Sequence, residues 1–168
     1  SPITLTVKPS PELDLTYFMQ RDVLGDDPLT EEVEPSEPAE FALLINNVGR
    51  GDATNVRLTT GQPGIVDNEK GLAIDIRFVS TQLNGEDHAL MLGDKYTSDF
   101  GDIESGSLAY AQWWLESSLL GHFTEYDVQA THLTSYGNPD LSLLGKVEIH
   151  ELIRGFDIAS ADKRLRAF

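Results

Sequence analysis

The chain has 168 residues, with 28 acidic against 12 basic side chains for a net charge of −16, and no cysteine. The acidic excess repels nucleic acid and anionic membranes, so we exclude both as partners. Without cysteine there are no disulfides, no Cys-ligated metal sites and no thiol catalysis. No apolar run approaches the ~18 residues that a membrane-spanning helix needs.

The chain begins SPITLTVKPS, without an initiator Met or a basic n-region. We therefore expect it to be a piece of a longer protein. It also contains no Asn-x-Ser/Thr acceptor for glycosylation. Together with the missing disulfides, this absence favours a bacterial origin.

Residues that alternate between apolar and polar predict half-buried β-strands, because successive side chains of a strand point to opposite faces of the sheet. Such alternation occurs at 3–7, 13–17, 72–78 and 126–130. Residues 41–45 and 108–115 are apolar on both faces, which is typical of central strands.

Turn residues separate these runs, and Asn84-Gly85 is a strong hairpin signal. About eight strands at this spacing, without helical segments between them, predict an all-β fold. We expect an immunoglobulin-like antiparallel β-sandwich in a single domain, 1–158, followed by a tail or linker at 159–168.

Two segments depart from this alternation. Residues 20–38 are acidic and contain three prolines, so we expect a long acidic loop that wraps one end of the sandwich. Residues 143–156 form an irregular C-terminal segment that fits a short helix about as well as a strand. The β-branched Val147 and Ile149 favour the strand.

A recognisable motif lies in residues 38–58, PAEFALLINNVGRGDATNVRL, where N-x-G-x-G-x-A-x-N-V follows one apolar strand and leads into another. A G-x-I-x-x-G turn then precedes a later strand in FGDIESGSLAYAQWWL. Over residues 38–135 this pattern resembles the CARDB-type immunoglobulin-like modules of large bacterial surface and secreted proteins. The resemblance implies a sandwich of about seven strands that serves as a spacer, stalk or adhesion module, usually without a catalytic site.

The same motif contains Arg50-Gly51-Asp52, the tripeptide that integrins recognise. We interpret Gly49 and Gly51 as residues that supply positive φ where the chain reverses. We expect Asn47 to bond back to the turn. Arg50 and Asp52 are then solvent-side residues between required glycines, and the tripeptide is an accident of turn chemistry.

The richest source of metal ligands is the acidic loop, which carries Asp22, Asp26, Asp27, Glu31 and Glu32. Calcium prefers six to eight oxygen ligands, and loops at the ends of sandwiches often provide them. Calcium is therefore the one cofactor that the sequence suggests, although none of these residues matches an EF-hand. The alternative is that they are solvated charges.

Trp113 and Trp114 are adjacent on a predicted strand, so only one of them can face the core. The other lies under a covering segment or is exposed. An exposed Trp near Tyr110 or Tyr136 can stack on a sugar ring or meet a neighbouring domain.

We expect a non-catalytic extracellular or cell-surface module that acts in structural spacing or cell adhesion. Its partners would be neighbouring domains of the same chain and a glycan or protein ligand. Two alternatives stay open: a carbohydrate-binding module that uses the exposed Trp, and a glycoside-active enzyme with two facing carboxylates. A zinc protease is excluded, because His150-Glu151 lacks the second His of H-E-x-x-H and has Arg154 in its place.

Overall fold

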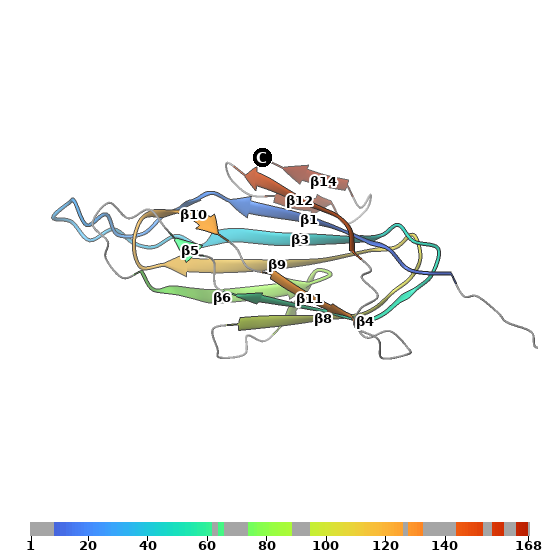
Figure 1. Cartoon of the computed structure of the whole chain (residues 1–168). Helices are drawn as coiled ribbons and strands as arrows, with labels where there is room; N and C mark the ends of the chain where they lie inside the picture. The colour runs from blue at the N-terminus through green and yellow to red at the C-terminus, as the bar shows by residue number, and fades with distance from the viewer. Residues whose placement is uncertain are drawn as a thin grey trace, which may run out of the picture.

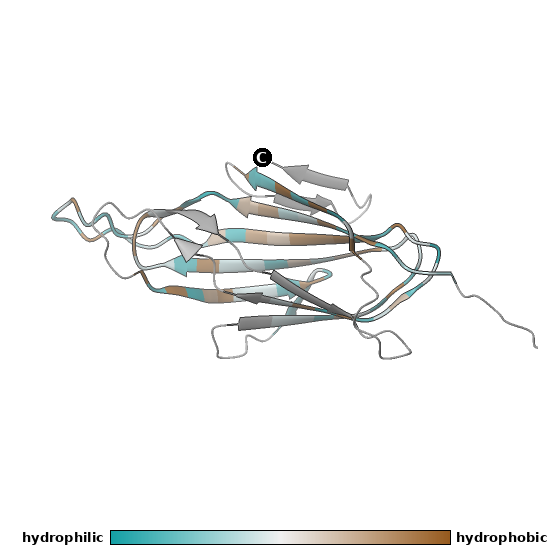
Figure 2. Cartoon of the chain, viewed as in Figure 1, coloured by the Kyte–Doolittle hydropathy of each residue, from teal (hydrophilic) through white to brown (hydrophobic). Residues whose placement is uncertain are grey.

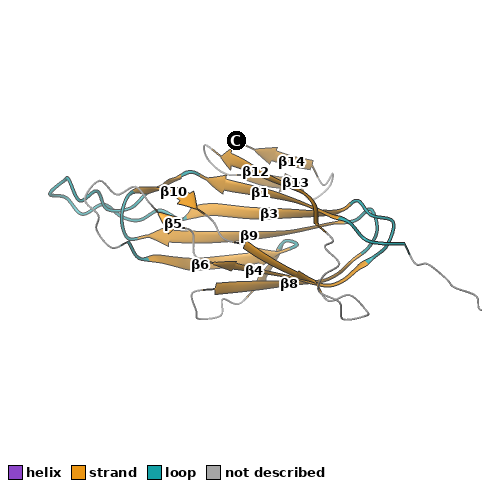
Figure 3. Cartoon of the chain, viewed as in Figure 1, coloured by secondary structure: helices purple, strands orange, loops and turns teal. Residues whose placement is uncertain are grey.

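A computed structural model describes residues 9–61, 64–65, 74–88, 95–125, 128–132, 144–152, 156–159 and 164–167. Every regular element in these ranges is a β-strand, which confirms the predicted all-β class (Figure 3). No helix in this part of the chain is long and apolar enough to span a membrane. The strand predicted at 3–7 and the residue Tyr136 lie outside the described residues.

The main layer is a six-stranded sheet in the order β12-β1-β3-β9-β6-β7 (Figure 1). Its strands are β12 (Leu144–Leu152), β1 (Leu13–Gln20), β3 (Ala39–Asn47), β9 (Leu108–Ser117), β6 (Ile76–Leu83) and β7 (Glu86–His88). All neighbours in it are antiparallel except β1 and β12, which run parallel. The sheet is therefore mixed, whereas the sequence predicted antiparallel pairs alone.

The remaining strands form two three-stranded sheets and a hairpin. One sheet has the order β11-β4-β8 and the other β2-β10-β5. Their strands are β4 (Ala53–Gly61), β8 (Lys95–Ile103), β11 (Val128–His132), β2 (Asp22–Val23), β5 (Gly64–Ile65) and β10 (Gly121–Glu125). The hairpin joins β13 (Phe156–Ala159) to β14 (Arg164–Ala167), so part of the predicted tail at 159–168 is a strand.

The hydrophobic core lies between the six-stranded sheet and strands β4 and β8. Along β9 every second residue from Ala109 to Ser117 is buried, because a strand places alternate side chains on opposite faces. The inward side chains of β1, β3 and β9 form one cluster with Val56 and Leu58 of β4 and with Phe100 and Ile103 of β8. This packing of two layers is that of a β-sandwich, and Figure 2 shows hydrophobic segments along β1 and β3.

The acidic segment 20–38 is largely irregular and extends from one end of the sandwich (Figure 1), which confirms the predicted loop. It is tied down by the pairing of β2 with β10 and by a bridge between Asp26 and Leu119. The hairpin at Asn84-Gly85 is also confirmed. It joins β6 to β7, and both turn residues have positive φ, 50° and 87°, as a two-residue primed turn requires.

The two glycines of the Arg50-Gly51-Asp52 region do not have positive φ, so that interpretation was wrong. They are required for a different reason. A Cβ at Gly49 would overlap the backbone of Pro11 and Glu12, and a Cβ at Gly51 would overlap the backbone of Pro9. The glycines therefore allow the segment before β1 to lie directly against the turn.

The two charged residues of this tripeptide belong to the turn surface. Arg50 is exposed, as predicted. Asp52 is exposed as well, but its Oδ1 accepts a hydrogen bond from the Ser105 amide at 2.9 Å. Asp52 therefore links this turn to the β8–β9 turn, which gives its carboxylate a local structural role.

Candidate ligand-binding face

Trp113 and Trp114 lie on opposite faces of the six-stranded sheet, as their adjacency predicted. Trp113 has 0% exposed surface and packs against Phe41, with ring centroids 5.7 Å apart. Trp114 is half-buried on the outer face, away from the core. Trp113 therefore belongs to the core, and Trp114 is the tryptophan that a ligand can reach.

The outer face around Trp114 is polar. Trp114 pairs across the sheet with Glu40 of β3 and with Ser80 of β6. Gln112 and Glu116 lie two residues before and after it on the same face of β9. The Gln112 Nε2 donates to Glu40 Oε1 at 3.0 Å. Hydrogen-bonding side chains thus surround the indole.

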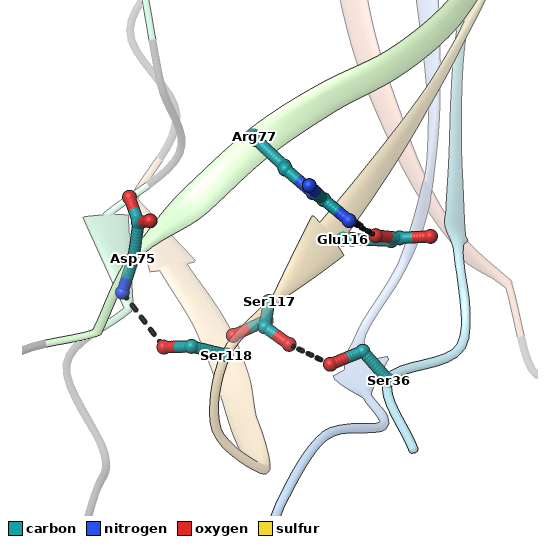
Figure 4. A pocket seen from close by; sticks show the side chains of 6 residues that line it. All are labelled: Ser36, Asp75, Arg77, Glu116, Ser117 and Ser118. Carbon is teal, nitrogen blue, oxygen red and sulfur yellow. Dashed lines mark hydrogen bonds and ion pairs between the residues drawn. The ribbon is translucent and has the colours of Figure 1, made fainter.

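A pocket of about 220 Å³ opens at the end of this face, where β6 and β9 meet the acidic loop (Figure 4). Its walls are Ser36, Asp75, Arg77, Glu116, Ser117 and Ser118. Arg77 donates through Nε and Nη2 to Glu116 Oε2, at 3.0 and 2.5 Å. This hydrogen-bonded ion pair raises the pKa of Arg77, so its guanidinium carries a fixed charge.

Hydrogen bonds between serine side chains and backbone groups, and one bond between backbone groups, hold the pocket walls. The Asp75 amide donates to Ser118 Oγ at 2.9 Å, and the Ser118 amide donates back to the Asp75 carbonyl at 2.8 Å. Ser36 Oγ donates to the Ser117 carbonyl at 2.7 Å, which attaches the acidic loop to β9. The pocket therefore offers two carboxylates, hydroxyls and one guanidinium, a donor and acceptor set suited to a polyhydroxylated ligand.

Two of the five predicted calcium ligands fix the backbone of the acidic loop. Asp26 Oδ1 accepts from the Glu34 amide at 2.9 Å, and Asp27 Oδ1 accepts from the Leu29 amide at the same distance. Such bonds from Asp side chains to nearby amides are a common way to stabilise turns. These two carboxylates are therefore part of the loop's own framework.

The other three predicted ligands lie at the surface. Asp22 accepts from Arg21 Nε at 3.3 Å, and Glu31 and Glu32 are exposed. Within the described ranges no three His, Asp or Glu side chains come together as a group that could hold a metal ion. The calcium site stays a prediction.

Sequence reasoning named Trp113 and Trp114 as candidates without deciding which of them is accessible, and it did not identify the pocket beside Trp114. Arg77 and Glu116 are 39 positions apart in sequence and meet only because β6 and β9 are neighbours in the sheet. One signal was available: residues that alternate with the buried positions of β9 share a face with Trp114, and they include Gln112 and Glu116. No sequence pattern indicated that Ser36 and Asp75 line a pocket.

No family model matches the chain, and no curated protein matches it. Among solved structures, it is similar to an inactive mutant of the GH20 exo-β-N-acetylglucosaminidase from Vibrio harveyi, with 14% identity and a TM-score of 0.40. The similarity covers 86% of this chain and 18% of that chain. So distant a similarity carries no functional conclusion, and the resemblance to CARDB-type modules rests on the sequence motifs.

Proposed function

We propose that the chain is a non-catalytic module of a larger extracellular or cell-surface bacterial protein, in which it serves as a load-bearing spacer. The observation that carries this proposal is the parallel pairing of β1 with β12. Because the two strands run in the same direction, the chain enters the sheet at one end and leaves β12 at the other. This path suits a module that is joined end to end with its neighbours.

Tension along such a chain loads the β1–β12 pair in shear. The two strands pair from Leu13 opposite Leu144 to Gln20 opposite Leu152, with one register shift between Leu13 and Leu15 and continuous pairing from Leu15 onward. Hydrogen bonds of a parallel ladder are evenly spaced across the strands, so a pull along the strands loads them together. A pull that peels the strands from one end would break the same bonds one after another.

Side-chain contacts hold β12 at both of its ends. Near its start, the Lys146 amide donates to Asp14 Oδ1 at 2.8 Å, where the register shifts by a bulge. Near its end, Leu152 packs with Phe18 in a small apolar cluster on the outer face. The Phe18 ring also stacks on His150, with centroids 5.4 Å apart. Burial of Leu152 adds about 1.5–3 kcal/mol to this attachment.

The segment that leads into β1 is also attached, by backbone hydrogen bonds to the β3–β4 turn. The Val48 amide donates to the Glu12 carbonyl at 2.8 Å, and the Gly51 amide donates to the Ser10 carbonyl at 3.2 Å. Force that enters at the N-terminal side of β1 therefore reaches a segment already bonded to the β3–β4 turn. This attachment supports a load-bearing role.

The glycoside-active alternative has a weaker basis. Asp75 and Glu116 both line the pocket, and paired carboxylates are what glycoside hydrolysis uses. However, two donors of Arg77 already engage one oxygen of Glu116, so that oxygen is occupied within the protein instead of being free to exchange a proton with a substrate. We therefore favour the non-catalytic role.

Single-molecule pulling tests the spacer proposal, and the absence of cysteine permits handles at chosen sites. One variant carries Ser10→Cys and Glu151→Cys, so that force shears β1 against β12. The matched control carries Arg21→Cys and Glu151→Cys, so that force unzips the same pair from one end. All three positions are exposed. We expect a several-fold higher unfolding force in the shear geometry, and equal forces in the two geometries would contradict the proposal.

A further inference from the structure

We propose that the outer face around Trp114 binds a neutral glycan, with one sugar ring on the indole and its hydroxyls in the adjoining pocket. This site goes beyond the spacer proposal and does not depend on it. It rests on three features of the described residues: the position of Trp114, the fixed polar groups around it and the charge of the surface.

The position of Trp114 suits stacking. The core is filled by its neighbour Trp113, which is fully buried, so the fold does not need a second indole inside. Trp114 instead lies half-buried on the outer face of β9, between Glu40 and Ser80 of the two neighbouring strands. An indole combines a large apolar face with a polar edge, and the C–H face of a pyranose ring packs against such a surface.

The polar groups beside Trp114 match the hydroxyls of a sugar. Each hydroxyl both donates and accepts, carboxylates accept, and a guanidinium donates. Glu116 and Arg77 supply an acceptor and donors two residues along from the indole, and Gln112 supplies both on its other side. The Arg77–Glu116 and Gln112–Glu40 bonds already hold these side chains, which lowers the entropy cost of binding.

The size of the site points to a short stretch of an oligosaccharide. The pocket of about 220 Å³ is smaller than the ~300–1,000 Å³ of sites that enclose drug-sized ligands. Tyr110 lies on the same face of β9, four residues and about 13 Å from Trp114. A glycan placed along β9 would therefore contact the pocket, Trp114, Gln112 and Tyr110 in succession.

The charge of the surface selects a neutral glycan. The chain carries a net charge of −16, and two carboxylates, those of Asp75 and Glu116, line the pocket. The positive charge of Arg77 is balanced by Glu116. Uronate, sialate or sulfate groups would meet repulsion here, whereas neutral hexoses and N-acetylhexosamines would not.

Titration of the whole chain tests the site. The probes are neutral gluco-, manno-, xylo- and chito-oligosaccharides, with oligogalacturonate as the anionic probe, followed by calorimetry and tryptophan fluorescence. We expect at least one neutral oligosaccharide to bind with a Kd below about 1 mM and to change the fluorescence. Trp114→Ala should weaken this binding at least tenfold, and Glu116→Gln several-fold.

The matched control is His150→Ala, a change on the far side of the same sheet face, on β12. It should leave the Kd unchanged. If Trp114→Ala fails to fold, Glu116→Gln and Ser118→Ala still test the pocket. No binding of any neutral oligosaccharide, tighter binding of oligogalacturonate, or an unchanged Kd in the pocket variants would each overturn the proposal. The pulling experiment has a separate readout, so either proposal can fail alone.

Discussion

The side-chain amide of Asn47 donates a hydrogen bond to the Gly51 carbonyl at 2.9 Å, and Asn47 itself has no exposed surface. The same amide donates to the Ile103 carbonyl, also at 2.9 Å. Its oxygen accepts from the amides of Gly49 and Glu12, at 3.1 and 3.3 Å. One side chain thus joins the segment before β1, the β3–β4 turn and the end of β8.

Replacement of Asn47 by Ala should therefore destabilise the whole sandwich. It would leave buried backbone groups without partners, and each such group costs about 1–3 kcal/mol. We expect a loss of about 3 kcal/mol in the free energy of unfolding, measured by urea denaturation. Asn46→Ala is the matched control, because Asn46 is the exposed neighbour on the opposite face. It should change stability by less than about 0.5 kcal/mol, and equal effects of the two variants would contradict this role.

Gly51→Ala separates the structural use of the Arg50-Gly51-Asp52 tripeptide from an adhesive one. The new Cβ would overlap the Pro9 backbone, and overpacking of this kind costs about 1–3 kcal/mol. Arg50→Ala, at an exposed side chain, should be neutral in the same urea titration. Integrin-dependent cell attachment that is lost in both variants, although Arg50→Ala stays folded, would show an adhesive role instead.

Much of the fold could be predicted because period-two patterns record which face of a strand is buried. Trp113 and Trp114 were predicted to lie on opposite faces because they are adjacent on a strand. The Asn84-Gly85 hairpin was predicted from turn chemistry. The direction of β12 could not be predicted, since pairing with β1 depends on residues some 130 positions earlier. Its own side chains gave little help: Val147 and Ile149 alternate like a half-buried strand, yet they are 54% and 65% exposed.

The structural reason for Gly49 and Gly51 could not be predicted either, because it also depends on residues that are distant in sequence. A glycine in a turn motif predicts positive φ, and this rule needs only local sequence. At Gly49 and Gly51 the constraint comes from residues 9–12 instead, whose backbone lies against the turn. The pocket beside Trp114 likewise assembles side chains from three separate segments. Local patterns report burial and turns, whereas contacts between distant segments arise only from the complete topology.

The acidic loop permits a direct test for calcium. Asp26 and Asp27 each already use one carboxylate oxygen to accept a loop amide. We therefore expect the same Tm in EDTA and in millimolar calcium. A calcium ion that binds only the folded state, at 100 times its Kd, would add about 2.7 kcal/mol and raise Tm by several degrees. Such a rise, abolished by Asp27→Asn, would establish the site that the sequence predicted.

Stability at alkaline pH should depend on Tyr17. This residue is 5% exposed and packs against Phe41, with ring centroids 6.2 Å apart. Burial raises the pKa of the Tyr17 hydroxyl well above its ordinary value, because the low-dielectric interior disfavours the phenolate. In the unfolded chain the same hydroxyl ionises near pH 10.

The sign of the effect follows from proton counting. Below about pH 10 both states keep the Tyr17 proton, so this residue contributes no pH dependence. At higher pH the unfolded state releases the proton and the folded state retains it, so the free energy of unfolding falls as pH rises. Tyr17→Phe keeps the ring and removes the ionisation. We expect its loss of stability between pH 9 and about pH 11 to be smaller than that of the unsubstituted chain, measured by urea titration at each pH. Parallel pH profiles for the two proteins would show that the Tyr17 hydroxyl is not held neutral in the core.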